Sequence, residues 1–334
     1  MTRTLSGTAL LAAIGAACSS PDSTSTPGEG PKEFAWTLAS PCPLARFEAN
    51  TVVVGAEVWV MGGFTSADLA VTRRVDIYDP EADSWHRGPD LPGAETHVAV
   101  ISVDGDIIVA GGFAGGFTVA RPPPTEAVHR LNVATEEWTA GPTLPTRGAA
   151  FAWALVGTEF HVASGLAGDG NSDANIHHVW DLAGPPEWAT AANLPNARNH
   201  GGGAAVGGLF YAIAGRHGWN EQSGAVADVH AFDPADGTWT ARAAIPGARS
   251  EIGAATMTLR DGRILVVGGS LPGVVPSDDV LVYHPARDAW SSLPPLPEPR
   301  KGAVAAQIGG RIVVTTGSPT SIDPSATTFI GCCL

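Results

Sequence analysis

One aromatic landmark recurs along the chain at a nearly constant interval. Six tryptophans stand about fifty residues apart, namely Trp36, Trp85, Trp138, Trp188, Trp239 and Trp290. A second landmark, a pair of small residues that closes an apolar run, repeats with the same period, as Gly62-Gly63, Gly111-Gly112, Ser164-Gly165, Ala214-Gly215, Gly268-Gly269 and Thr316-Gly317. Two independent landmarks that share one period indicate six copies of a single structural unit.

Each unit contains four short runs that are typical of β-strands. The first is rich in Ala, Val and Gly, as in residues 94–103 and 253–259, and the second ends in the small-residue pair. The third places an aromatic residue before a turn, as in Tyr78-Asp79-Pro80, and the fourth carries the tryptophan and ends in a pair such as Leu91-Pro92. Apolar and β-branched runs between Gly and Asp-Pro turns predict strands.

Composition agrees with an all-β chain and excludes several alternatives. The 334 residues include 41 Gly and 27 Pro, which a helical bundle cannot accommodate. A hydrophobic content of 44% is too high for a disordered chain. The net charge of −14 argues against nucleic acid as a partner, because an acidic surface repels phosphate backbones.

A four-stranded sheet repeated radially is the blade of a β-propeller. The small-residue pair, the aromatic turn and the spaced tryptophan resemble the kelch repeat over residues 34–334, although the third repeat has Trp180-Asp181-Leu182 at its turn. WD repeats have a shorter period and do not fit. The resemblance implies a six-bladed kelch-type propeller.

The phase of the repeat predicts how the ring closes. The chain starts with a fourth strand at 34–38 and ends with a third strand at 326–331. The last blade should therefore take its fourth strand from the N-terminus, which removes open sheet edges. Deletion of residues 32–40 is expected to lower the melting temperature strongly.

The N-terminus has the features of an export signal. Arg3 precedes a short apolar segment that ends in Gly15-Ala16-Ala17-Cys18, which resembles the lipobox of bacterial lipoproteins except for Gly15. We expect a signal peptide at 1–18 with lipidation at Cys18, a flexible tether at 19–31 and a propeller at 32–334. Secretion with cleavage nearby, or a retained apolar segment, are the alternatives. The expected location is a membrane-anchored lipoprotein facing the periplasm or the cell surface.

The cysteines other than Cys18 do not indicate a metal site. Cys42 aligns with Leu91 and should fill a buried, leucine-like position. A Cys42–Cys332 disulfide is excluded because the repeat register separates these residues by about 20 Å. Cys332 and Cys333 are either a vicinal disulfide or free thiols.

Polar residues gather where the first strand of each unit begins. Five arginines stand there, with Glu95 at the equivalent place in the second unit, namely Arg46, Arg147, Arg198, Arg249 and Arg300. First strands line the channel of a propeller, so these arginines could attract an anion at the channel mouth. The competing structural interpretation is that each arginine binds carbonyls or acids of a neighbouring blade.

A second polar set follows two residues later. Glu48, His97, His200 and Glu251 should face the same side of the strand as the arginines. Glu48 and Glu251 could neutralise Arg46 and Arg249. A His/Glu metal site across the channel would need a short span between these side chains.

A third set lies in the loop of the third unit. Asp169, Asn171 and Asp173 carry alternating oxygen side chains that suit Ca²⁺, the one cofactor considered, although the EF-hand pattern fails at Ala174 and Trp180. Asp169, Asp173 and His177 also resemble the iron motif of plant specifier kelch proteins, with Asp in place of Glu. Ordinary loop chemistry explains the same residues.

Trp219 lies outside the repeat landmarks and offers a flat apolar face to a sugar or a peptide, unless it packs over its own blade. We therefore expect a non-catalytic, surface-exposed and monomeric propeller that binds a protein or a glycan at its loop face. The alternative is an enzyme similar to the periplasmic N-acetylneuraminate epimerases, with Glu48, Glu95 and Glu251 as acid–base groups beside the arginines. Copper-radical oxidase chemistry is not supported, because Tyr78 and Tyr283 occupy the repeat's turn position.

Overall fold

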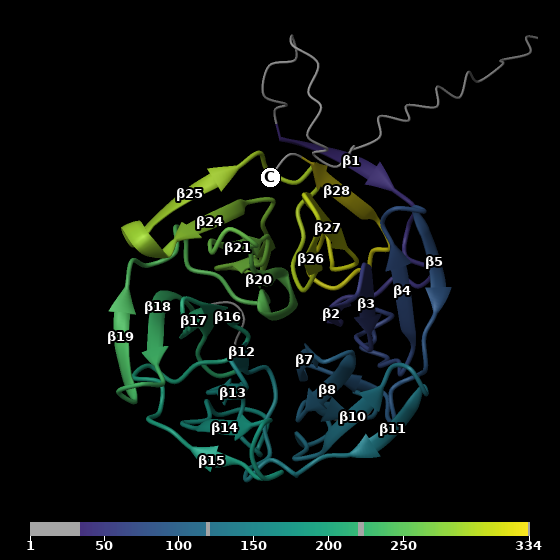
Figure 1. Cartoon of the computed structure of the whole chain (residues 1–334). Helices are drawn as coiled ribbons and strands as arrows, with labels where there is room; N and C mark the ends of the chain where they lie inside the picture. The colour runs from purple at the N-terminus through teal and green to yellow at the C-terminus, as the bar shows by residue number, and fades with distance from the viewer. Residues whose placement is uncertain (1–33, 118–120, 220–223, 333–334) are drawn as a thin grey trace, which may run out of the picture.

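The computed structural model describes residues 34–117, 121–219 and 224–332. These residues form six four-stranded antiparallel sheets arranged radially around a central channel, which confirms the predicted all-β, six-bladed propeller (Figure 1). The predicted signal peptide at 1–18, with Cys18, and the predicted tether at 19–31 lie outside the described residues. Within the described part of the chain, no helix combines the length and the apolar character needed to cross a bilayer.

The first strand of each blade lines the channel and the fourth lies at the rim (Figure 1). In chain order the blades are β2 (Asn50–Val54), β3 (Glu57–Met61), β4 (Val75–Asp79), β5 (Ser84–Arg87); β7 (Ala99–Val103), β8 (Asp106–Ala110), β10 (Val128–Asn132), β11 (Glu137–Ala140); β12 (Ala152–Val156), β13 (Glu159–Ala163), β14 (His177–Asp181), β15 (Ala189–Thr190); β16 (Gly202–Val206), β17 (Leu209–Arg216), β18 (Ala225–Asp233), β19 (Thr238–Arg242); β20 (Thr256–Thr258), β21 (Ile264–Val267), β24 (Val280–His284), β25 (Ala289–Leu293); and β26 (Val304–Ile308), β27 (Arg311–Thr315), β28 (Thr328–Cys332), β1 (Ala35–Ala39).

The N-terminal strand closes the ring as predicted. Strand β1 pairs antiparallel with β28, with Trp36 opposite Gly331 and Leu38 opposite Phe329. The sixth blade is therefore built from both ends of the propeller, and its fourth strand leaves no unpaired edge on β28. The observed bounds differ from the predicted strands by one or two residues.

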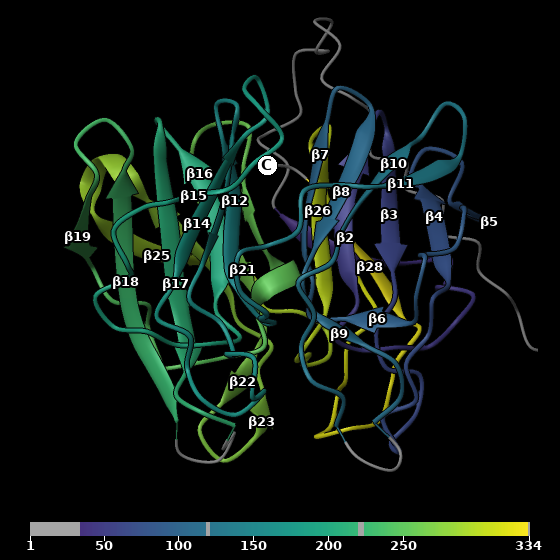
Figure 2. The same cartoon turned by 90° about the horizontal axis from the view of Figure 1, so that it is seen from below.

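Two short strand pairs and two 3-10 turns complete the structure. The strand pairs are β6 (Glu95–Thr96) with β9 (Phe113–Ala114) and β22 (Ser270–Leu271) with β23 (Val275–Pro276). They lie on the side from which the loops between second and third strands emerge, which we call the loop face (Figure 2). The 3-10 turns are η1 (Gly253–Ala255) and η2 (Pro285–Arg287). The first strand predicted at 253–259 is thus wrong in its first half, where η1 replaces it.

The spaced tryptophans join neighbouring blades. Five of the six indole N–H groups donate to a backbone carbonyl at the end of the preceding blade's outer strand; for example, Trp85 donates to Ser40 at 2.8 Å and Trp290 to Ala243 at 2.9 Å. The exception is Trp138, whose buried indole nitrogen has no partner among the described residues. The repeat of fifty residues is therefore also a repeat of inter-blade contacts.

The small-residue pair is required by backbone geometry. Both positions have positive φ in every blade, with +62° at Gly62 and +92° at Gly63. A Cβ on Gly62 would lie 2.1 Å from the carbonyl oxygen of Glu95 in the next blade. Ser164 also adopts this left-handed conformation, at a cost of about 1–2 kcal/mol. The degenerate pairs thus keep the same turn and carry strain.

The cysteine predictions agree with the structure where it describes them. Cys42 is a free cysteine, 3% exposed, and its N–H donates to the carbonyl of Ala326 at 2.8 Å as the equivalent Leu91 donates to Arg73. Burial raises the pKa of its thiol. Cys332 is disulfide-bonded, and not to Cys42. Cys333 lies outside the described residues.

Candidate functional site

Six equivalent positions line the channel just inside the loop face. All of them have positive φ, between +51° and +59°, and they are Glu48, His97, Ala150, His200, Glu251 and Gly302. Backbone hydrogen bonds link most of them to the preceding blade; for example, Glu48 N–H donates to the carbonyl of Gly302 at 2.7 Å and His200 N–H donates to that of Ala150 at 2.9 Å. Four of these residues carry a carboxyl or an imidazole group. The other two, Ala150 and Gly302, are small and leave the centre of the channel open to these groups.

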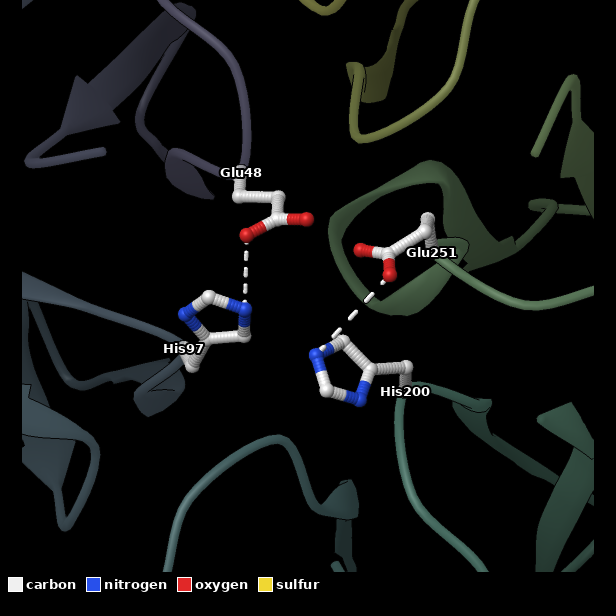
Figure 3. A group of neighbouring side chains, drawn as sticks. All are labelled: Glu48, His97, His200 and Glu251. Atoms are coloured by element: carbon white, nitrogen blue, oxygen red, sulfur yellow. Dashed lines mark ion pairs between the residues drawn. The ribbon is translucent and has the colours of Figure 1, made fainter. Parts of the chain in front are cut away.

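The four functional side chains point at one another across the channel (Figure 3). His97 Nε2 lies 2.7 Å from Glu48 Oε2, and His200 Nε2 lies 3.9 Å from Glu251 Oε1. The two imidazole rings meet edge to face with their centroids 4.9 Å apart. Each side chain is at least nine-tenths buried. We call this group the channel cluster. The distance across the channel between these four side chains, which the sequence alone did not give, is therefore short.

Burial and mutual charge perturb the channel cluster strongly. Burial, together with the nearby Glu251 carboxylate, raises the pKa of Glu48 to about 7. Burial also opposes ionisation of Glu251, but Arg216 and His200 outweigh it and hold the pKa of Glu251 well below its usual range. Burial and the Arg216 guanidinium lower the pKa of His200. One carboxylate is thus held ionised while the other retains a proton up to neutral pH.

A small cavity lies directly beneath the channel cluster. It encloses about 40 Å³ and is lined by all four side chains, with Trp153 among the residues on its far side. Trp153 also lines a wider opening of about 550 Å³ farther along the channel. A cavity of the smaller size has room for one or a few water molecules. The channel cluster is therefore close to solvent without being exposed to it.

Trp153 is a residue that sequence reasoning missed. It lies in β12, and its indole N–H donates to Val100 of the adjacent blade at 2.8 Å. The strand registers place small or medium residues at the equivalent position of other blades, namely Thr51, Val100, Gly203 and Ala305. The sequence did contain a signal for Trp153, because a tryptophan stands there at a strand position that small or medium residues fill in the other blades.

The predicted arginine ring has a structural role. Arg46, Arg198, Arg249 and Arg300 are at most 3% exposed. Arg46 pairs with Asp76 and donates to the carbonyl of Arg74 at 2.9 Å, and Arg249 pairs with Asp279 at 2.8 Å. These partners belong to the arginine's own blade rather than to a neighbour. The geometry of these four residues supports the structural interpretation, with partners in the same blade instead of a neighbouring one, and gives anion binding no support.

Two further details of the arginine prediction are also wrong. Arg147 is not an equivalent position, because Ala149 N–H pairs with Leu166 as Phe47 N–H pairs with Phe64, which aligns Gly148 with Arg46. The side chain of Arg147 is 55% exposed and contacts Glu126. Glu48 and Glu251 do not neutralise Arg46 and Arg249; they contact His97 and Arg216 instead.

Glu95 replaces an arginine in the second blade and is itself buried. Burial raises its pKa to about 7, and its Oε2 has no partner among the described residues. The enzyme alternative places Glu48, Glu95 and Glu251 as acid–base groups beside the arginines at the channel mouth. Four of those arginines are buried within the blades, so the geometry gives this alternative no support.

The predicted calcium ligands, Asp169, Asn171 and Asp173, make hydrogen bonds that hold their loops in place. The Asp169 carboxylate accepts hydrogen bonds from Asn171 N–H at 2.8 Å and Ser172 N–H at 2.9 Å. Asp173 accepts from Asn199 Nδ2 at 2.5 Å and contacts His217 at 3.0 Å. These contacts account for the oxygens, and the geometry lends calcium no support.

The iron motif does not assemble either. His177 is buried in the third blade, where its ring nitrogens contact His161 at 3.0 Å and the carbonyl of Ala192 at 2.9 Å. Asp173 lies in the loop and contacts the fourth blade instead. Asp169, Asp173 and His177 therefore do not come together as ligands of one ion.

Trp219 is the centre of a contact between three loops. Its indole is covered on one face by the guanidinium of Arg121, whose central carbon lies 3.8 Å from the ring centroid. Arg121 also donates to Asn171. The loops of the second, third and fourth blades thus meet at Trp219, which remains 36% exposed. The expectation that Trp219 is available on the loop face agrees with this placement.

Exposed apolar residues are concentrated on the same face. The described part of the chain has four exposed large hydrophobic residues. Trp219, Val275 and Ile322 follow the second strands of the fourth, fifth and sixth blades, so they lie on loop-face segments. Leu38 is the fourth and belongs to β1 at the rim.

Comparisons with known proteins place this structure in context. The family model described as Kelch motif matches residues 45–92, 96–145, 197–243 and 253–297, together more than half of the chain. The kelch-like protein terF of Aspergillus terreus is 27% identical over 253 residues, which are 71% of this chain and 52% of that protein. Kelch-like protein 34 of Homo sapiens is 26% identical over 239 residues, 69% of this chain and 36% of that protein. Kelch-like protein 36 of Bos taurus is 24% identical over 284 residues, 81% and 43% of the two chains. The chain thus spans about half of these relatives or less.

Proposed function

Because the chain belongs to the kelch-repeat family of β-propellers, we propose that it is a non-catalytic binding protein that holds a protein partner on its loop face. The observation that carries this proposal is the placement of Trp219, Val275 and Ile322 on loop-face segments of three consecutive blades. Loops on a rigid scaffold are frequent binding elements. Trp and Arg are also the residue types that contribute most to protein interfaces.

A protein is favoured over a glycan by the kind of residues on this face. A sugar ring stacks on the flat face of an aromatic side chain, and one face of Trp219 is already covered by Arg121. Val275 and Ile322 offer aliphatic surface, which suits an apolar segment of a polypeptide. The predicted glycan ligand therefore remains the second candidate, with Trp219 as its contact.

The test compares loop-face and rim variants in chemical crosslinking. The chain is crosslinked in the producing cells, and its partners are identified by mass spectrometry. Trp219→Ala combined with Val275→Ser and Ile322→Ser should reduce recovery of the partner at least tenfold. Leu38→Ser removes an exposed apolar side chain from the rim and should leave recovery unchanged. Equal recovery with the loop-face and rim variants would contradict the proposal.

We also propose that the chain is exported and anchored through a lipid on Cys18, and that it acts as a monomer. The apolar segment before Gly15-Ala16-Ala17-Cys18 and the polar residues 19–31 support this location. Labelling with an alkyne fatty acid should mark the wild-type chain and not Cys18→Ser. Equal labelling of both would contradict the lipid anchor.

A further inference from the structure

We propose that the channel cluster is a binding site for one divalent first-row transition metal ion, with Glu48, His97, His200 and Glu251 as ligands. This inference does not depend on the loop-face proposal. One ligand atom from each residue lies within 4.8 Å of the other three. Imidazole nitrogen and carboxylate oxygen are common ligands of Zn²⁺, with bonds of about 2.0–2.2 Å. A tetrahedral ion places such ligands about 3.4 Å apart, which falls between the 2.7 Å and 4.8 Å of the channel cluster.

His97 presents an unused ligand atom to the centre of the channel cluster. The hydroxyl of Thr96 donates its hydrogen to the carbonyl of Glu48 at 2.8 Å, so it must accept from His97 Nδ1 at 3.1 Å. In the neutral ring the proton is therefore on Nδ1, and Nε2 carries a lone pair. This buried nitrogen lies 2.7 Å from Glu48 Oε2. While Glu48 holds its proton, the carboxyl can donate it to Nε2, and a cation that displaces this proton would take both atoms as ligands.

His200 has the same tautomer for a similar reason. Asn199 donates through Nδ2 to Asp173 and to the carbonyl of Gly218, which turns its Oδ1 toward His200 Nδ1. The His200 proton is therefore on Nδ1, and Nε2 accepts from Arg216 at 3.1 Å. In both histidines the residue immediately before the ring fixes Nδ1 and leaves Nε2 for the channel. Metal-binding histidines are commonly oriented by a hydrogen bond of this kind at the other nitrogen.

The surroundings can accommodate an ion. An incoming cation replaces the Arg216 N–H at His200 Nε2, while the guanidinium can stay paired with Glu251. Ala150 and Gly302 occupy the two remaining ring positions and add no bulk. The cavity of about 40 Å³ beneath the channel cluster leaves room for water on the ion. The site would thus be closed by protein on most sides and open toward the cavity.

The experiment is equilibrium dialysis of the full chain against Zn²⁺ after EDTA treatment, followed by metal analysis. We expect one Zn²⁺ per chain, and a loss of at least 100-fold in affinity for both His97→Ala and His200→Ala. His86→Ala is the matched control, because it removes an exposed histidine that also lies near a glutamate, Glu57, at 3.6 Å. That variant should bind as the wild type does.

A second readout does not rely on variants that could fold poorly. Co²⁺ added to the wild-type chain should give the intense visible absorption of a tetrahedral ion with nitrogen and oxygen ligands, and Zn²⁺ should abolish it. No stoichiometric Zn²⁺ together with no such Co²⁺ band would overturn the proposal. Undiminished binding by folded His97→Ala and His200→Ala would overturn it as well.

Discussion

The arginines at the start of the first strands and the acids and imidazoles two residues later differ in how they are used. Arg46 and Arg249 are turned into their own blades, where carboxylates and carbonyls pair with them. Glu48 and Glu251 are turned into the channel, where they meet His97 and His200. Because the second set has positive φ, the usual rule that residues i and i+2 share a face does not hold here.

The comparison shows that a polar residue in a buried ring is not by itself a binding residue. Every guanidinium nitrogen of Arg46 and Arg249 donates a hydrogen bond within the fold. In the channel cluster, by contrast, His97 Nε2 carries a lone pair and lies 2.7 Å from the Glu48 carboxyl. We infer that the arginines stabilise the blades and that the channel cluster is a binding site.

The largest expected effect is that of removing one of these arginines. Arg46→Met leaves the buried Asp76 carboxylate with Arg74 alone and leaves the carbonyl of Arg74 with only the N–H of Gly62. Breaking a buried ion pair typically costs about 3–5 kcal/mol. Urea denaturation should show a loss of that size in the free energy of unfolding. A loss below about 1 kcal/mol would mean that Arg46 is not part of the structural support.

A smaller and pH-dependent effect is expected at the channel cluster. An unfolded glutamate titrates near pH 4.5, whereas burial and Glu251 raise the pKa of Glu48 to about 7. Between these values the folded chain holds a proton that the unfolded chain has lost, so stability falls as pH rises. In EDTA, wild type should lose about 3 kcal/mol relative to Glu48→Gln between pH 4.5 and pH 8. Denaturation curves at both pH values measure this difference.

The control for that pH effect is the same comparison at low pH. Below pH 4.5 the glutamate is protonated in both states, so Glu48→Gln and the wild type should differ little in stability. If their difference in unfolding free energy is the same at all pH values, the Glu48 carboxyl does not titrate as proposed.

The smallest effect is expected for the arginine that is out of register. Arg147 is exposed and pairs with the exposed Glu126. Exposed ion pairs contribute about 0–1 kcal/mol. Arg147→Met should therefore change the free energy of unfolding by less than about 1 kcal/mol, in contrast to Arg46→Met. A cost equal to that of Arg46→Met would remove the distinction between the two positions.

The fold could be predicted from the sequence because its determinants repeat. Tryptophans, small-residue pairs and turn aromatics recur with one period, and the phase of that period gave the closure by β1 and the buried position of Cys42. The site could be predicted only in part. Glu48, His97, His200 and Glu251 were all candidates, but the direction of their side chains depends on a local φ that the residue types do not reveal.

Other errors have equally local causes. Arg147 was assigned to the ring because the offset of one residue in the third blade is visible only in the backbone hydrogen bonds that align Gly148 with Arg46. The loop of Asp169 and Asp173 has the composition of a cation site, yet its oxygens accept hydrogen bonds from neighbouring segments. Such contacts depend on which loops meet, and one sequence does not give that.

The central claim is that His97 and His200 hold their protons on Nδ1 and direct unprotonated Nε2 atoms into the channel. Long-range ¹H–¹⁵N NMR of the imidazole rings tests it most directly, in EDTA at about pH 8, above the range in which a free imidazole is protonated. The structure predicts Nδ1–H tautomers for both rings, and loss of the signal that identifies His97 in His97→Gln would secure its assignment. Protonated Nε2 on either ring would contradict the account.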